Sequence, residues 1–148
     1  MAFGSNLGDR RQHLLWAAAR LEEVLSGLLL STVIETDAED VPDVQPPYLN
    51  AVAVGQCELP PHQLLERLQQ IERDRNRTRP GWRAARTLDL DLILYGDLVV
   101  EEPDLTLPHP RFRERRFVLE PLVQVAPELR DPVTGRTAAE LLALLAEK

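Results

Sequence analysis

Lysine is almost absent from this sequence. Of its 17 basic residues, 16 are arginine, and the only lysine is Lys148. The chain therefore has no internal lysine for a Schiff base, for a GxxxxGK[ST] phosphate-binding loop or for the strand lysine of protein kinases. Any nucleotide site in this chain must hold its phosphates with other groups.

Cysteine and long apolar runs are also scarce. A single cysteine, Cys57, excludes an internal disulfide framework and favours a reducing compartment. No apolar run approaches the roughly 18 residues of a membrane span, and the N-terminus lacks a signal-peptide pattern. We therefore expect a cytoplasmic protein with no membrane partner. The 148 residues, 44% of them hydrophobic, suit one domain over residues 1–148 with a real core.

The distribution of charge is more informative than its total. The net charge of −7 argues against nucleic acid as a partner, because such proteins present a basic surface. Residues 73–86 nevertheless carry six arginines and one acid, and residues 111–116 carry four arginines and one acid. Codon bias is an alternative explanation for the number of arginines, but not for their position. Two local basic segments in an acidic chain indicate a site for a small anion.

The periodicity of apolar residues predicts a mixed α+β domain. A turn at residues 4–9, which can supply Asn6 or Asp9 as a helix cap, precedes a helix that Gly27 helps to end. The apolar stripe of this helix consists of Leu14, Ala18, Leu21, Leu25 and Leu28. A strand over residues 28–35, a loop over 37–47 and a strand over 48–59 follow. Only three residues precede Gly4, which predicts a short first strand.

A second helix follows Pro60-Pro61, with Leu64, Leu68 and Ile71 on one side. Residues 88–95 form the clearest strand, and the turn at Gly96-Asp97 predicts a hairpin with residues 98–100. The last helix covers about residues 137–146. The order β-α-β-β-α-β predicts a ferredoxin-like sandwich with helices on one face of the sheet and an extra C-terminal hairpin and helices.

The strand over residues 88–95 contains two aspartates in alternation with leucines. Because alternate side chains of a strand share a face, Asp89 and Asp91 stand together, with their Cα atoms about 6.6 Å apart. Two carboxylates this close repel one another, and a divalent cation such as Mg²⁺ removes that repulsion. The alternative is an exposed strand face whose acids pair with nearby arginines.

Basic residues lie on both sides of this aspartate pair in the sequence. Arg77 and Arg86 precede it, and His109 and Arg115 follow one connection later. Guanidinium groups match phosphate oxygens two at a time, so arginines beside Mg²⁺ ligands are typical of a polyphosphate site. Taken singly, each arginine has an alternative role in a surface ion pair, and His109, which lies between two prolines, has one as a turn residue.

A few aromatic residues are candidates for binding a flat heterocycle. Tyr48 and Asn50 are two positions apart on a predicted strand, so a ring and an amide share one face. Trp82 and Phe117 lie in the arginine-rich segments of a chain that is only 5% aromatic. Ordinary strand packing is the alternative for the first pair.

These motifs together resemble the 6-hydroxymethyl-7,8-dihydropterin pyrophosphokinase family. The resemblance covers nearly the whole chain and follows the family order. The matching segments are Gly4-Ser5-Asn6-Leu7-Gly8, Pro47-Tyr48-Leu49-Asn50-Ala51, Arg86-Thr87-Leu88-Asp89-Leu90-Asp91-Leu92, Pro108-His109, Arg115-x-Phe117-Val118-Leu119-x-Pro121-Leu122 and Ala126-Pro127-Glu128.

The resemblance implies an ATP-dependent diphosphotransferase of folate biosynthesis, which moves the diphosphate of ATP to the hydroxyl of 6-hydroxymethyl-7,8-dihydropterin and releases AMP. It implies two Mg²⁺ ions on Asp89 and Asp91, and catalytic roles for Arg77, Arg86 and His109. It implies an ATP site formed by Gln69, Leu92, Thr106, His109 and Arg115. It implies a pterin site formed by Thr36, Tyr48, Asn50, Trp82 and Phe117.

Two segments depart from the family pattern. Residues 36–40 lack the proline and glycine of the usual Thr-x-Pro-x-Gly loop, and Trp82 lies four residues before Arg86 instead of three. Two other functions fit part of the pattern, a Mg²⁺-dependent phosphohydrolase and a ferredoxin-like binding module. We expect a monomer whose substrates are ATP and the pterin.

Overall fold

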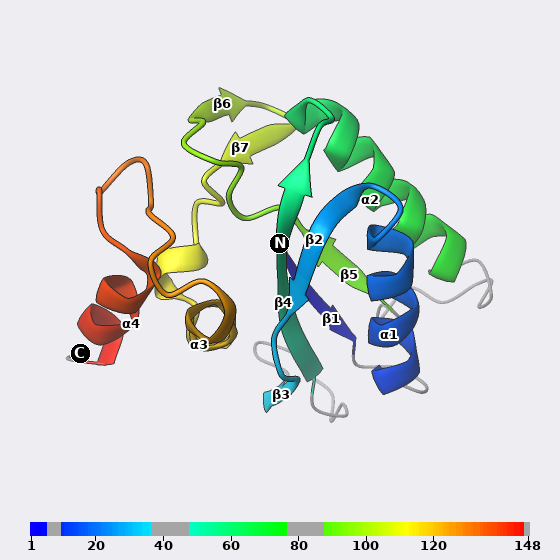
Figure 1. Cartoon of the computed structure of the whole chain (residues 1–148), viewed down its shortest axis with the longest axis horizontal. Coiled ribbons are helices and arrows are strands. Elements are labelled where there is room, and N and C mark those ends of the chain that lie inside the picture. Colours follow the sequence, from blue (N-terminus) through cyan, green and yellow to red (C-terminus); the bar gives the residue numbers. More distant parts are fainter. Residues whose placement is uncertain (6–9, 37–47, 77–87, 147–148) are drawn as a thin grey trace.

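The structure is a computed structural model that describes residues 1–5, 10–36, 48–76 and 88–146. In these ranges an antiparallel sheet of five strands has helices on both faces (Figure 1). Helices α1 (Arg10–Leu21) and α2 (Pro61–Asn76) cover one face. Helix α3 (Arg116–Val125) covers the other, and α4 (Ala138–Ala146) packs on α3. The mixed α+β class is confirmed.

The strand order is β2 (Leu25–Leu30), β4 (Tyr48–Cys57), β1 (Ala2–Ser5) and β5 (Asp89–Asp91). Strand β3 (Ile34–Thr36) pairs with the start of β4, on the edge of β4 that β2 also uses. Strand β1 has four residues and pairs with β4 along one side and with β5 along the other. The pairing of β1 with both β4 and β5 fixes which residues lie side by side: Phe3 of β1 lies between Ala51 of β4 and Leu90 of β5.

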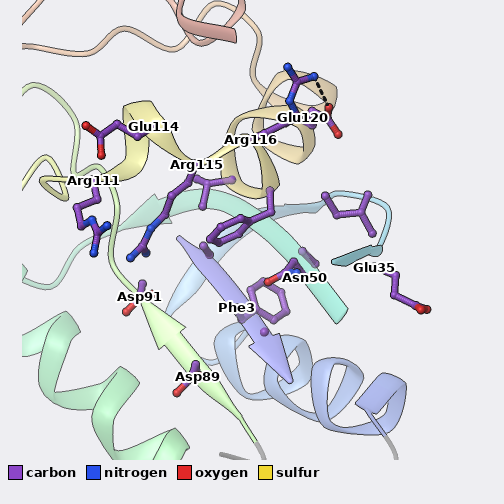
Figure 2. A pocket seen from close by; sticks show the side chains of 16 residues that line it. Phe3, Glu35, Asn50, Asp89, Asp91, Arg111, Glu114, Arg115, Arg116 and Glu120 are labelled. Atoms are coloured by element: carbon purple, nitrogen blue, oxygen red, sulfur yellow. Dashed lines mark hydrogen bonds and ion pairs between the residues drawn. The ribbon is translucent and has the colours of Figure 1, made fainter. Parts of the chain in front are cut away.

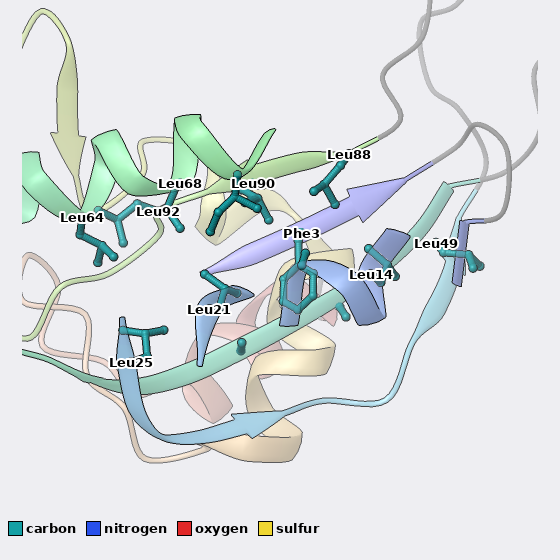
Figure 3. Close-up of a cluster of buried hydrophobic side chains, with 14 of the residues drawn as sticks. Phe3, Leu14, Leu21, Leu25, Leu49, Leu64, Leu68, Leu88, Leu90 and Leu92 are labelled. Carbon is teal, nitrogen blue, oxygen red and sulfur yellow. The ribbon is translucent and has the colours of Figure 1, made fainter. Parts of the chain in front are cut away.

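One core lies between the sheet and the helices α1 and α2 (Figure 3). The spacing that predicted α2 is confirmed, because Leu64, Leu68 and Ile71 are all buried there. Phe3 and Leu90 meet them from the sheet. Strand β5 therefore has one face anchored in apolar packing.

A second core lies on the opposite face of the sheet, under α3. It contains Val52 and Ile93 from the sheet side, Val118 and Leu122 from α3, and Leu141 from α4. The two helices of the predicted sandwich, α1 and α2, share one face of the sheet, and the additional C-terminal helices α3 and α4 lie on the other side. Apolar side chains point from both faces of the central strands, so both faces need cover.

The predicted first helix is too long. Helix α1 ends at Leu21, and Leu25 and Leu28 belong to β2. Gly27 has a φ of 62° and lies where the β2–β4 register shifts between Ser26 and Leu29, so it forms an irregularity in a strand instead of ending a helix. A leucine-rich run satisfies both helical and strand periods, which explains the error. The strand predicted over residues 28–35 is likewise divided between β2 and β3.

The predicted hairpin after Gly96-Asp97 is wrong as well. The turn exists, with the Leu98 N–H donating to the Tyr95 carbonyl at 3.1 Å, but no ladder follows it in the described chain. The hairpin joins β6 (Val100–Glu102) to β7 (Leu105–Leu107). Pairing of the preceding segment with β1 stops at Asp91, opposite Ala2, and beyond it the Ile93 carbonyl accepts from the His109 N–H.

The C-terminal region holds the segment before α3 in place. The predicted last helix is confirmed as α4, which Thr137 and Glu140 cap reciprocally with hydrogen bonds of 2.9 and 3.2 Å. The 3₁₀ turn η1 (Phe112–Glu114) buries Phe112 in the second core. Its Arg113 binds the buried Asp131 through Nε and Nη2, at 2.5 and 2.9 Å. None of the helices in the described ranges is both long and apolar enough to cross a lipid bilayer.

Candidate active site

A cleft of about 1100 Å³ lies between the sheet and the segment that contains η1 and the start of α3 (Figure 2). Its floor is formed by β1, β4 and β5, and its opposite wall by residues 111–120. Five residues of the predicted site line it: Asn50, Asp89, Asp91, Arg115 and Phe117. The structure thus brings together side chains that are far apart in the sequence.

The register of the sheet explains why both aspartates face this cleft. Gly4 lies beside Asn50 on one side and Asp89 on the other, while Ala2 lies beside Asp91. Gly4 has no side chain and Ala2 has only a methyl group, so the strand between β4 and β5 leaves the floor open. Leu90 points to the opposite face and is 5% exposed, which orients its two neighbours toward the cleft.

The two carboxylates fit a hard divalent cation. Asp91 is exposed and Asp89 is half-buried, so both are accessible from the cleft. Carboxylate oxygens are the ligands that Mg²⁺ takes in proteins, usually together with water and substrate phosphates. The donor set of this face therefore suits Mg²⁺ carried by a polyphosphate.

A contact that the sequence did not reveal fixes β5 from its outer side. The side-chain oxygen Oε2 of Glu72, on α2, accepts a hydrogen bond of 2.8 Å from the Leu90 N–H. Leu90 lies between the two aspartates, and β5 pairs along one side with β1. Glu72 therefore satisfies a donor at the sheet edge and holds the short strand in position. No local sequence pattern points to a partner 18 residues away.

The four arginines of residues 111–116 divide into two pairs. Arg113 binds Asp131, and Arg116 forms a 3.2 Å ion pair with Glu120. Arg111, Arg115 and Arg116 all line the cleft, and of these Arg111 and Arg115 extend toward the sheet near Asp91 (Figure 2). The guanidinium of Arg115 also lies over the Phe117 ring, with 5.6 Å between its carbon and the ring centroid.

His109 lies beside this group. Its backbone N–H donates to the Ile93 carbonyl at 2.8 Å, and its Nδ1 accepts from the Arg111 N–H at 3.2 Å. Burial lowers the pKa of His109 below its usual 6.5, and Arg115 and Arg111 lower it further, against the opposing effect of Asp91. Near pH 7 the imidazole is therefore neutral. Because Nδ1 is an acceptor, Nε2 carries the proton and is available as a donor.

Two of the predicted pterin residues line the cleft, Asn50 in register with Gly4 and Asp89, and Phe117 beside Arg115. Asn50 is 9% exposed and Phe117 is half-buried, and both line the cleft. The backbones of Thr36 and Tyr48 face each other across the β3–β4 ladder, next to Glu35 at the cleft edge. Arg77, Trp82 and Arg86 lie outside the described residues. The two segments that depart from the family pattern also lie outside them, except for Thr36.

Three residues predicted to contact ATP do not line this cleft. Gln69 on α2 and Thr106 on β7 are exposed. Leu92 is 7% exposed and its side chain packs in the first core, so a nucleotide contact there would involve its backbone. Gln69 lies on α2, which packs on β5, and Leu92 directly follows β5; the role of all three residues remains a prediction.

Comparison with known proteins gives a consistent result. Residues 1–127 match the family of 7,8-dihydro-6-hydroxymethylpterin-pyrophosphokinase (HPPK). The chain is 38% identical to the 2-amino-4-hydroxy-6-hydroxymethyldihydropteridine pyrophosphokinase of Bacillus subtilis, over 91% of this chain and 81% of that protein. It is 38% identical to the protein of the same name from Pseudomonas aeruginosa, over 97% and 88%.

A longer relative is the folic acid synthesis protein fol1 of Schizosaccharomyces pombe, with 35% identity over 96% of this chain. The chain spans 20% of that protein's length. The resemblance seen in the sequence motifs is confirmed by a family match that covers the whole candidate cleft. The chain belongs to the 7,8-dihydro-6-hydroxymethylpterin-pyrophosphokinase family.

Proposed function

We propose that this protein transfers the diphosphate of ATP to the hydroxyl of 6-hydroxymethyl-7,8-dihydropterin and releases AMP, as a step of folate biosynthesis. One observation supports this above the others. A single cleft is lined by two aspartates on its floor, by two arginines that extend toward Asp91 (Figure 2), and by the amide of Asn50 and the aromatic ring of Phe117. Such a cleft has a polyphosphate half and a heterocycle half.

The polyphosphate half would bind ATP with Mg²⁺. Asp89 and Asp91 would hold two Mg²⁺ ions, which when bound neutralise phosphate charge and align the nucleotide. Arg115 would bind phosphate oxygens, and the Nε2–H of His109 would donate to the same group. Gln69, Leu92 and Thr106 would contact the rest of the nucleotide, and Arg77 and Arg86 would stabilise charge during transfer.

The heterocycle half would bind the pterin. Phe117 would stack on one face of the ring and Tyr48 on the other, while the Asn50 amide would hydrogen-bond the ring edge. Thr36 and Trp82 would complete the site. The chain then supplies alignment and charge neutralisation to the attack of the pterin hydroxyl on the β-phosphorus, without a protein nucleophile.

We also propose that the fold is ferredoxin-like and that one cytoplasmic domain acts as a monomer. The element order β-α-β-β-α-β, with β3 as an addition, and the strand order β2-β4-β1-β5 support the fold. The continuous cores on both faces of one sheet support a single domain.

Product analysis tests the function. Purified protein with Mg²⁺·ATP and the hydroxymethyl pterin should produce AMP and the pterin diphosphate in equal amounts, and neither product without the pterin. Formation of ADP, or of AMP from ATP alone, would contradict the proposal and favour a phosphohydrolase.

A further inference from the structure

Arg111 stands out among the arginines of the cleft wall. Arg113 and Arg116 of the same segment are each paired with a carboxylate, Asp131 and Glu120 respectively. Within the described chain the guanidinium of Arg111 has no such partner, although its side chain is exposed in the cleft and extends toward Asp91 (Figure 2). An unpaired cation at this place is available to an anionic ligand.

The backbone of Arg111 is held on both sides. Its N–H donates to Nδ1 of His109, and its carbonyl accepts from the Glu114 N–H at 3.1 Å. The next residue, Phe112, is 1% exposed in the second core. The Arg111 backbone is therefore fixed at the cleft wall, and less backbone freedom is lost on binding than at a mobile loop.

The charges around Arg111 match a polyphosphate. Its guanidinium acts electrostatically on His109, as Arg115 does, so both cations lie near the imidazole. Asp91 supplies a negative group on the opposite side, which fits a cation bound between it and the phosphates. A guanidinium fork that shares the cleft with a proposed Mg²⁺ ligand is suited to the oxygens of a nucleotide phosphate.

We propose that Arg111 is a further ATP-binding residue, whose guanidinium binds a phosphate oxygen beside Asp91 and complements Arg115. This rests on the proposed function. Arg111 adds a cation to the phosphate half of the cleft and leaves the pterin half unchanged. Its removal should therefore weaken nucleotide binding selectively.

The test compares Arg111→Ala and Arg111→Lys with Arg116→Ala, a matched control in the same segment whose arginine is already paired with Glu120. Dissociation constants are measured by calorimetry for a non-hydrolysable Mg²⁺·ATP analogue and, separately, for the pterin. Loss of one charge-assisted hydrogen bond predicts about a tenfold higher nucleotide Kd for Arg111→Ala and about threefold for Arg111→Lys. The pterin Kd and the Arg116→Ala control should change less than about twofold.

The salt dependence of binding gives a second readout. The nucleotide Kd of the wild type should rise more steeply with ionic strength than that of Arg111→Ala. The variant lacks one charge contact with the nucleotide that salt would otherwise screen. Equal nucleotide Kd values in wild type and Arg111→Ala would overturn the role of Arg111 while leaving the proposed function intact. A wild-type protein that binds the analogue but makes no AMP with the pterin would overturn the proposed function alone.

Discussion

Replacing Asp131 by asparagine tests how the wall of the cleft is held in place. The carboxylate is 1% exposed and accepts four hydrogen bonds, two from Arg113, one of 2.8 Å from Thr134 Oγ and one of 3.0 Å from the Val133 N–H. Arg113 belongs to η1, and Arg111 and Arg115 flank that turn. The Asp131 network therefore fixes the backbone from which both cleft arginines extend.

The pKa of Asp131 gives the magnitude. Burial raises this pKa, but the hydrogen bonds from Arg113, Thr134 and Val133 lower it more, from 3.8 to about 2. A difference of nearly two pKa units corresponds to about 2 kcal/mol of stabilisation from the ionised carboxylate. Because asparagine also leaves the half-buried Arg113 without a counter-charge, the free energy of unfolding at pH 7 should fall by about 3 kcal/mol.

The sign of the pH dependence follows from the direction of the shift. A carboxyl whose pKa is lowered on folding contributes its full stabilisation above the pKa of the unfolded chain, near 4, and loses it as the pH falls toward 2. Urea unfolding followed by circular dichroism at pH 7, 4, 3 and 2 should therefore show the wild type losing about 2 kcal/mol more than Asp131→Asn over the acid range. Glu128→Gln, an exposed acid nearby, is the control and should match the wild type.

Two results would refute this reasoning. Equal slopes of stability against pH in the wild type and Asp131→Asn would show that the Asp131 carboxylate is not the stabilised form in the folded protein. A loss below about 1 kcal/mol at pH 7 would show that Arg113 tolerates the missing charge. A double-mutant cycle with Arg113→Ala isolates the energy of the pair from other effects of each substitution.

Three further predictions concern the cleft. Asp91→Asn should keep the fold and lower AMP formation by about 100-fold or more at 1 mM Mg²⁺; retention of full activity would contradict a metal role. Glu72→Ala should raise the Mg²⁺ concentration needed for half-maximal activity several-fold, because the Leu90 N–H loses its acceptor. Glu72→Gln keeps an acceptor and should not raise this concentration, and neither should the exposed control Glu66→Ala. His109 should titrate below 6.5 by NMR, and Arg111→Ala should raise its pKa; an unchanged value would show that the guanidinium lies elsewhere.

The sequence predicted best those elements whose periodicity leaves no alternative. Helix α2 and strand β4 have a clear 3.6-residue or two-residue pattern, and both are found at the expected place. The same reasoning placed Asp89 and Asp91 on one face, because the leucine between them must point into the core. Errors arose where a leucine run fits two periods, as between Leu21 and Leu30.

Contacts between distant residues could not be predicted in this way. The Glu72 contact with β5 and the Arg113–Asp131 pair each join positions 18 residues apart, and neither leaves a mark in local sequence. The hairpin after the fifth strand was misplaced for a related reason. Ile93 and Leu94 continue the apolar run, but pairing with β1 ends at Asp91, and the Ile93 carbonyl accepts from His109, 16 residues further along the chain.

The division of the arginines shows what the structure adds to a charge pattern. Residues 111–116 carry a local charge of +3 in an acidic chain, which indicated an anion site without showing which arginines form it. Arg113 serves the fold through a buried carboxylate, and Arg116 pairs along its own helix. Arg111 and Arg115 extend into the cleft toward Asp91 (Figure 2). The fold therefore neutralises part of this basic segment and leaves Arg111 and Arg115 facing Asp91, where the proposed phosphate site lies.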